Sequence, residues 1–145
     1  MLKIVNFMTI TIIVTVLIVG CRSTASSDVT VTFLQDGDTF ETGEFHTFEV
    51  RLMDETGEPI EVDNVQIHIN MERMNHPMTG TMRMDDDGTY SVELPLAMEG
   101  EWYVDVTTLL EDEESIERFY IHAEGEMAED YMRGFDADKG EVPNH

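Results

Sequence analysis

Residues 85–106 read DDDGTYSVELPLAMEGEWYVDV, and this stretch carries the pattern that decides the fold. Apolar and polar side chains alternate along residues 89–96 and again along 101–109, as expected of β-strands that each bury one face. Asp87-Gly88 before the first run is a tight-hairpin signal, because glycine adopts positive φ without a steric penalty. We therefore predict two short antiparallel strands here, with Trp102 at the head of the buried face of the second.

Similar alternation recurs on both sides of this stretch, with turn-forming Gly, Pro, Asn and Asp residues between the runs. No helix of convincing length is expected before residue 124. The pattern predicts an all-β fold, an immunoglobulin-like antiparallel β-sandwich of about seven strands, over residues 29–123. Buried apolar strand faces can hold such a sandwich together without disulfides. The other five strands are expected at residues 29–34, 45–53, 62–71, 79–84 and 116–123.

The composition is strongly acidic. Among 145 residues there are 31 Asp and Glu against 8 Lys and Arg, which gives a net charge of −23. Phosphate would repel such a chain, so nucleic acid is excluded as a class of partner. With 41% hydrophobic residues, the chain has enough apolar material for one packed domain. The acidic, glycine-containing stretch 124–145 is expected to be a flexible tail with one helical turn near residues 127–132.

The N-terminus has the form of a signal peptide. Residues 1–20 hold an uncharged, mostly apolar run behind Lys3, and Ile18-Val19-Gly20-Cys21 resembles a bacterial lipobox. We predict that Cys21 is lipidated, that residues 21–28 form a tether, and that the protein sits on the outer face of the bacterial cytoplasmic membrane. A diacylated cysteine supplies the two chains that stable anchoring needs. The alternative, an uncleaved anchor helix, leaves the domain on the same side of the membrane.

Four short motifs point to a known family. They are the turn Gly57-Glu58-Pro59, the loop Met74-Asn75-His76-Pro77-Met78, the hairpin Asp87-Gly88-Thr89-Tyr90 and the turn Met98-Glu99-Gly100-Glu101-Trp102. Their order resembles the YtkA-like family of bacterial extracytoplasmic domains, which are related to the FixH-like proteins. The resemblance implies an immunoglobulin-like sandwich, often lipid-anchored, without known enzymatic activity, and an association with copper and cytochrome oxidase assembly. The usual family loop resembles M-P-x-M-x-H, whereas here His76 precedes the proline.

Methionine is concentrated in one part of the chain. Five methionines fall between residues 71 and 84, and His76 lies among them. Thioether sulfur is a soft ligand that suits Cu(I), and imidazole binds Cu(I) or Cu(II), so the combination favours copper as a cofactor. Because Cys21 is the only cysteine and is expected to carry the lipid, a zinc-thiolate site is not expected.

The expected topology gathers the soft ligands at one pole of the sandwich. If successive strands are antiparallel, three of the connections between them lie together at the end far from the tether. His46 opens a strand there and, by parity with Phe48, points between the sheets. The alternative is plain packing, in which methionines fill an irregular gap and the two histidines bond loop backbone. The candidate metal ligands are His46, Met71, Met74, His76, Met78 and Met98.

Two functions follow from these features. The first is a membrane-anchored lipoprotein that binds or relays copper for respiratory oxidase assembly, with the oxidase or a copper-handling protein as its partner. The second is a metal-free interaction module that docks to a membrane complex. An enzyme is not expected, because the sequence has no nucleophile elbow, no phosphate loop and no usable cysteine.

Overall fold

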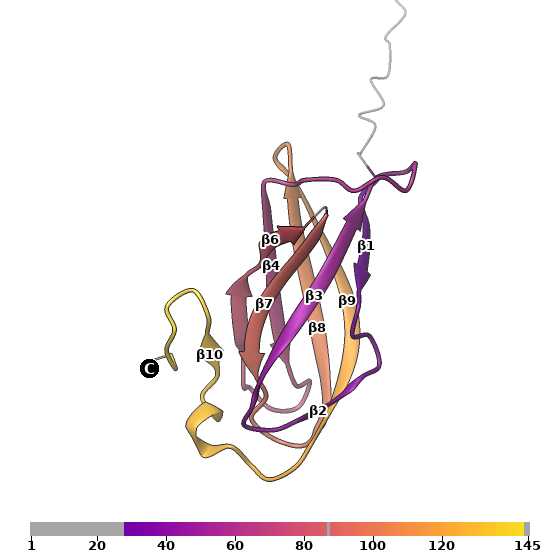
Figure 1. Cartoon of the computed structure of the whole chain (residues 1–145). Helices are drawn as coiled ribbons and strands as arrows, with labels where there is room; N and C mark the ends of the chain where they lie inside the picture. Colours follow the sequence, from indigo (N-terminus) through magenta and orange to yellow (C-terminus); the bar gives the residue numbers. More distant parts are fainter. Residues whose placement is uncertain (1–27, 87, 144–145) are drawn as a thin grey trace, which may run out of the picture.

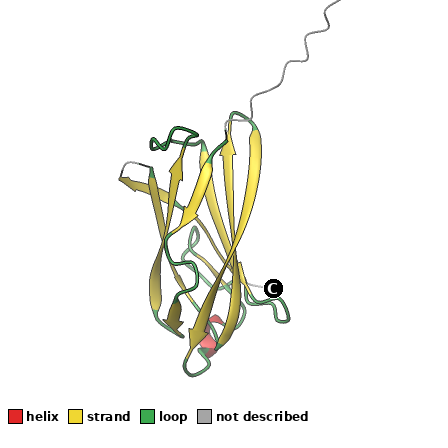
Figure 2. Ribbon diagram, turned by 90° about the vertical axis from the view of Figure 1, so that its right-hand side faces the viewer, coloured by secondary structure: helices red, strands yellow, loops and turns green. Residues whose placement is uncertain are grey.

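Two β-sheets pack face to face in this protein (Figures 1 and 2). The computed structural model describes residues 28–86 and 88–143. One 3-10 turn, Glu129–Tyr131, lies near the C-terminus. The strands are β1 (Thr30–Phe33), β2 (Thr39–Glu41), β3 (Phe45–Met53), β4 (Asn64–Asn70), β5 (Met78–Thr81), β6 (Arg83–Asp86), β7 (Thr89–Pro95), β8 (Gly100–Leu110), β9 (Glu113–Glu124) and β10 (Phe135–Asp136).

The sheet orders confirm the predicted all-β, immunoglobulin-like sandwich. One sheet has the order β1-β3-β7-β6 and the other the order β10-β5-β4-β8-β9-β2. Each of the seven expected strands has a counterpart, and residues 45–53 coincide with β3. The strands β2 and β10 were not expected. Both are short edge strands of the six-stranded sheet. The strand β2 pairs in parallel with β9, and β10 pairs in parallel with β5.

The strand expected at residues 79–84 is two strands in different sheets. The chain changes sheet at Met82, which is 3% exposed and whose N–H bonds the carbonyl oxygen of Val65 at 2.8 Å. Beyond this residue the chain pairs with β7 instead of β4. Buried residues alternate without a break through Met78, Gly80 and Met82. The sequence pattern therefore does not mark the point at which the chain changes sheet.

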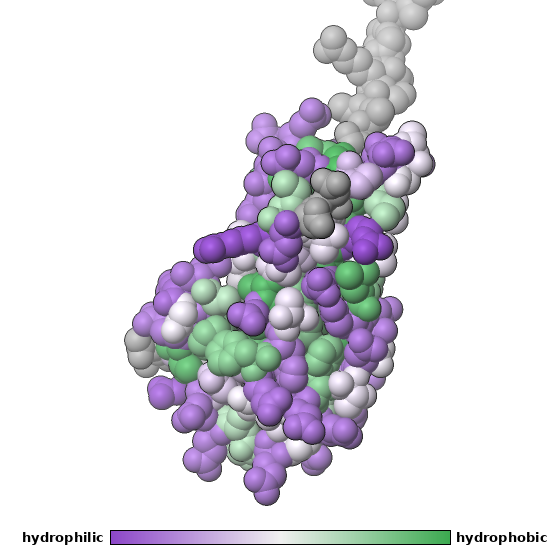
Figure 3. Space-filling view, viewed as in Figure 1, coloured by the Kyte–Doolittle hydropathy of each residue, from purple (hydrophilic) through white to green (hydrophobic). Residues whose placement is uncertain are grey.

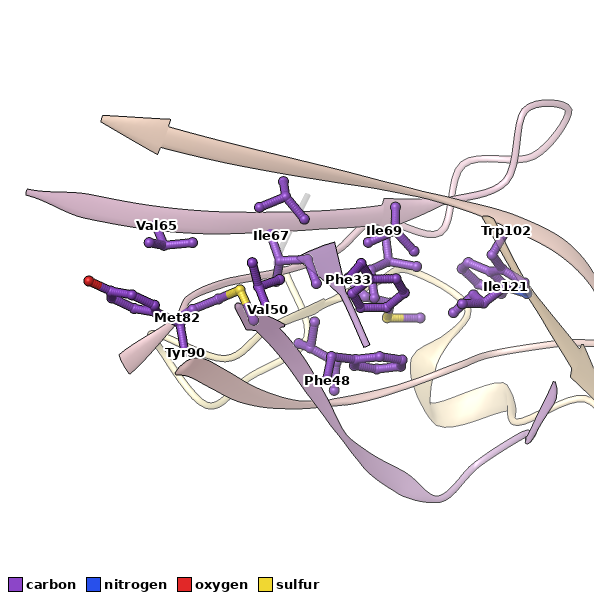
Figure 4. Close-up of a cluster of buried hydrophobic side chains, with 14 of the residues drawn as sticks. Phe33, Phe48, Val50, Val65, Ile67, Ile69, Met82, Tyr90, Trp102 and Ile121 are labelled. Carbon is purple, nitrogen blue, oxygen red and sulfur yellow. The ribbon is translucent and has the colours of Figure 1, made fainter. Parts of the chain in front are cut away.

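Alternate residues of the strands fill the space between the sheets. Trp102, Val104 and Val106 of β8 are fully buried, which confirms Trp102 as a core residue. Figure 4 shows side chains of the two sheets meeting, with Phe48 on one side and Ile69 on the other. Burial of this apolar surface stabilises the sandwich at about 25 cal/mol per Å².

Three connections converge at the end of the sandwich away from Asp28, as the antiparallel order predicts (Figure 1). We call this end, formed by residues 42–44, 71–77 and 96–99, the distal pole. A hydrogen bond from the N–H of Gly43 to the carbonyl oxygen of Leu96, 2.9 Å long, joins the first and third connections. The first residues of β3 and β8 and the last of β4 therefore lie at the same end.

The tail is packed against the sandwich, in contrast to the flexible tail expected at residues 124–145. Residues 125–143, here called the C-terminal segment, cross the distal pole and then run beside β5 (Figure 1). Tyr131, Met132 and Phe135 pack against the core. The prediction was based on the acidic composition of the tail and overlooked these apolar side chains, which give the segment a surface to bury. The 3-10 turn falls where one helical turn was expected.

The N-terminal predictions concern residues outside the described part of the chain. These are the signal peptide of residues 1–20, the lipidated Cys21 and all but the last residue of the tether. They stay predictions. Within residues 28–86 and 88–143, no helix has the length and apolar character that crossing a membrane requires.

Candidate metal site at the distal pole

The loop between β4 and β5 is fastened by one buried side chain. Asn70, 6% exposed, accepts hydrogen bonds at Oδ1 from the N–H groups of Met71 at 2.9 Å and His76 at 2.8 Å. Its Nδ2 donates to Oδ1 of Asn75 at 3.0 Å. Because both ends of the loop are bonded to one amide, Met71 and His76 are held in fixed relation to each other.

His76 has one ring nitrogen bonded and the other without a partner. Nδ1 lies 2.6 Å from the carbonyl oxygen of Met132, and a carbonyl only accepts, so Nδ1 carries the proton. In the neutral ring Nε2 is then a lone-pair nitrogen. The residue is 8% exposed, and Nε2 is the buried side-chain nitrogen without a hydrogen-bond partner among the described residues.

An unpartnered buried polar atom costs about 1–3 kcal/mol, so Nε2 needs an explanation. Histidines that bind metals usually donate their other N–H to a carbonyl or carboxylate, which fixes the tautomer and aims the free nitrogen. His76 has this arrangement. Its ring centroid is 6.2 Å from that of Trp102, which forms part of its apolar surroundings.

Met71 and Met98 flank the turn that leads into Trp102. A Cβ built on Gly100 would lie 2.7 Å from Cε of Met71, so this methyl group touches the turn directly. The carbonyl oxygen of Met98 accepts a hydrogen bond from Nε1 of Trp102 at 3.1 Å. Both methionines are partly buried against the core. Met71 thus contacts the turn at Gly100, Met98 contacts Trp102 through its backbone carbonyl, and the His76 ring lies beside that of Trp102.

Met74 and Met78 occupy different environments. Met74 is 49% exposed and lines a shallow cavity of about 360 Å³ together with Met71 and Glu101. Met78 is fully buried in the core and pairs in register with Ile69. Met78 is thus a core residue, whereas Met74 lies on the surface of the distal pole.

His46 lies at the distal pole but is tied to β2. Its Nε2 is 2.7 Å from the carbonyl oxygen of Glu41, and its ring centroid is 4.9 Å from that of Phe40. It is half-buried on the same side of β3 as Phe48, as predicted. His46 and Met98 therefore share one end of the sandwich, but the contacts of His46 join it to the β2 edge and not to His76.

Across the described residues, no group of three or more His, Cys, Asp or Glu side chains could hold a metal ion. His76 is therefore not joined by two further histidine, cysteine or carboxylate ligands, and the methionines of this pole are the other candidate ligands.

Sequence reasoning did not identify Asn70 and Met132 as parts of the site. Asn70 shares the polar face of β4 with Gln66 and His68, so the alternation of the sequence did not indicate that its side chain is buried. Met132 lies 56 residues beyond His76 and acts through its backbone carbonyl, so no side-chain pattern could have indicated it.

The family model for YtkA-like domains matches residues 23–107. The chain belongs to the YtkA-like family. The match includes the fastened loop and the Met98 turn but not the C-terminal segment of this YtkA-like protein. No curated protein sequence matches the chain.

Solved structures resemble the sandwich at low sequence identity. An endo-β-1,4-mannanase from Thermotoga petrophila is 12% identical with a TM-score of 0.52, and the match covers 68% of this chain and 20% of that chain. A Salmonella α-2-macroglobulin reacted with methylamine is 21% identical with a TM-score of 0.51, covering 68% of this chain and 6% of that chain. CopC from Methylosinus trichosporium OB3b is 12% identical with a TM-score of 0.48, covering 66% of this chain and 94% of that chain. The chain thus spans a fifth or less of the first two proteins, and the likeness shows the fold alone.

Proposed function

We propose that this YtkA-like protein is a membrane-anchored extracytoplasmic module that binds copper at the distal pole. The imidazole ligand is Nε2 of His76, and the soft ligands are the thioethers of Met71 and Met98. Met74 lies on the exposed side of the site. The supporting observation is the buried Nε2 of His76, unpartnered while Nδ1 already donates to a carbonyl. Bound copper would supply a soft, redox-active cation at this pole.

The ligand types select the metal. Thioether sulfur and neutral imidazole favour Cu(I), while Ca²⁺ and Mg²⁺ need several oxygen ligands. Neutral ligands leave the single charge of Cu(I) uncompensated within the site. The net charge of −23 surrounds the site with a negative field that favours the approach of any cation, and it adds no selectivity.

The proposed role outside the membrane is to hold or relay copper toward a respiratory oxidase or a copper-handling protein. A lipid at Cys21 would attach the chain close to Asp28, at the end opposite the distal pole (Figure 1). The site would then face away from the membrane, where a donor or a protruding partner domain can reach it. Because no group in this role carries out a covalent reaction, we propose a non-enzymatic protein.

A competition titration tests copper binding. Cu(I) is added without oxygen to the full chain in detergent with a chromophoric Cu(I) chelator, and we expect one Cu(I) per chain. His76→Ala should weaken binding at least about tenfold, because it removes the nitrogen ligand. His122→Ala is the control, because His122 is exposed on β9. Equal affinity of the parent and the His76→Ala variant would contradict the assignment.

The metal-free alternative rests on exposed apolar side chains near the same pole. Phe45, Met74 and Met127 are 48%, 49% and 56% exposed, and exposed apolar groups on one end of a molecule favour docking to another protein. This alternative predicts that the parent chain binds no Cu(I) in the titration and that Phe45→Ser weakens capture of a membrane complex. The copper-binding proposal predicts one Cu(I) per parent chain and weaker binding in His76→Ala.

A further inference from the structure

We infer that the C-terminal segment is a built part of the site: the Met132 carbonyl holds His76 in the tautomer that leaves Nε2 free for a metal. Met132 is thus a positioning residue that lies outside the part of the chain matched by the family model. The metal in this inference rests on the proposed function, whereas the tautomer does not.

Backbone hydrogen bonds fasten the segment on both sides of Met132. The N–H of Ala128 donates to the carbonyl oxygen of Ala97 at 2.7 Å, before Met132 in the chain. After it, the N–H of Phe135 donates to the carbonyl oxygen of Pro77 at 2.9 Å. Since Pro77 directly follows His76, this last bond fixes the segment next to the ring that Met132 contacts.

Side-chain bonds continue the attachment along β5. The N–H of Thr81 donates to Oδ1 of Asp138 at 2.8 Å, and its hydroxyl donates to Oδ2 of the same carboxylate at 2.8 Å. The N–H of Ala137 donates to the carbonyl oxygen of Thr79 at 2.8 Å. The segment is therefore bonded to β5 over the full length of that strand.

Two glycines make room for this close approach. Gly134 is buried with a φ of +98°, and a Cβ there would lie 2.3 Å from the carbonyl oxygen of Pro77. On the other side, a Cβ at Gly80 of β5 would lie 2.9 Å from Cβ of Ala137. Contacts this short exclude larger residues at both positions, so the docking of the segment is specific.

Aromatic contacts anchor the segment to the other sheet. The ring of Phe45 on β3 lies 5.7 Å from that of Tyr131 and 5.2 Å from that of Phe135, centroid to centroid, in edge-to-face geometry. Figure 3 shows apolar side chains gathered on the lower half of this face, among hydrophilic ones. Because these two aromatic residues bracket Met132, the anchor holds its carbonyl in place.

The Met132 carbonyl decides which ring nitrogen of His76 carries the proton. While the Met132 carbonyl accepts the Nδ1 proton, Nε2 keeps its lone pair. If the carbonyl moves away, the proton can reside on Nε2, which then blocks coordination until it leaves. Loss of such an outer partner typically lowers metal affinity about 10–100-fold.

A matched glycine pair tests the inference. Gly134→Ala should push the segment away from Pro77. Gly140→Ala is the control, because Gly140 also has positive φ, +67°, but faces open space. The first readout is the tautomer of His76 in the metal-free full chain in detergent, from ¹⁵N shifts of the ring. The second is Cu(I) affinity by competition.

The parent and Gly140→Ala should show the proton on Nδ1 of His76, and Gly134→Ala should show a shift toward Nε2 with about 10–100-fold weaker Cu(I) binding. A deletion of residues 127–145, which removes Met132 altogether, should give the same two changes. A deletion variant that keeps the Nδ1 tautomer would overturn the inference. If the parent binds no Cu(I), the proposed function fails while the tautomer still decides the role of Met132.

Discussion

Trp102 contacts both the Met98 turn and His76 at the distal pole. It is fully buried, its indole N–H bonds the Met98 carbonyl, and its ring lies beside His76. Its role is therefore structural, and it shapes the site without being a ligand. The sequence alone indicated its burial, because it heads the alternating face of β8, but gave no sign of the His76 contact.

Trp102→Ala should lower the free energy of unfolding by about 3–5 kcal/mol, because it opens a large cavity in the core. Urea unfolding followed by circular dichroism measures the change. An unfolding midpoint equal to that of the parent would show that the indole is not a core side chain.

His68 makes the stability of the domain depend on pH. It is half-buried on the outer face of β4, with its ring centroid 5.8 Å from that of Tyr103. Burial lowers the pKa of His68 below its ordinary value of 6.5, and Arg118 lowers it further, while the Asp105 carboxylate raises it. Arg118 is bonded to Asp105 at 2.7 Å and stacks on Tyr103.

Because the folded pKa of His68 is the lower one, the unfolded chain binds this proton more readily, and stability falls as the pH drops below about 6.5. His68→Gln should reduce the loss of stability between pH 7.5 and pH 5. Asp54 and Asp136, whose pKa values are lowered by hydrogen bonding, titrate below this window. NMR titration of the parent checks the origin, and a His68 pKa at or above 6.5 would contradict it.

The sequence predicts strands that have a clear period-two pattern and misses strands that lack one. The expected strand 45–53 coincides with β3, because nine residues alternate without interruption. The two residues of β10 are too few to show a period, and their pairing with β5 uses backbone groups alone. The same holds for the candidate site: the topology predicted that Met71, Met98 and His76 lie at one end of the sandwich, but no pattern indicated the Met132 carbonyl.

The loop at residues 71–77 depends on one amide. Asn70→Ala removes three hydrogen bonds at a buried position, so we expect a loss of about 1–3 kcal/mol in the free energy of unfolding. Amide hydrogen exchange should speed up at His76 and at Met71. At Val65, at the other end of β4, the exchange rate should change only as much as the lower stability of the whole domain requires. Unchanged exchange at His76 would mean that other contacts hold the loop.

Asp28 and the candidate site lie at opposite ends of the sandwich (Figure 1). The predicted tether, residues 21–28, ends at Asp28. If Cys21 carries the lipid, the fold itself acts as a spacer that presents the site away from the bilayer. The anionic surface, with 31 acidic residues in the chain, keeps such a domain off an anionic membrane.

Cys21→Ala should stop lipidation and change the membrane association of the protein. Metabolic labelling with a fatty acid should mark the parent and not the variant, because the thiol is the proposed attachment atom. Equal labelling of both chains would contradict the lipoprotein assignment.

The most direct test of a copper site at the distal pole is Cu K-edge X-ray absorption of the full chain loaded with one Cu(I). We expect sulfur ligands together with one imidazole nitrogen, and we expect this nitrogen signal to disappear in His76→Ala while the sulfur signal remains. A first shell of oxygen alone, or an imidazole signal that persists in His76→Ala, would contradict a copper site at the distal pole.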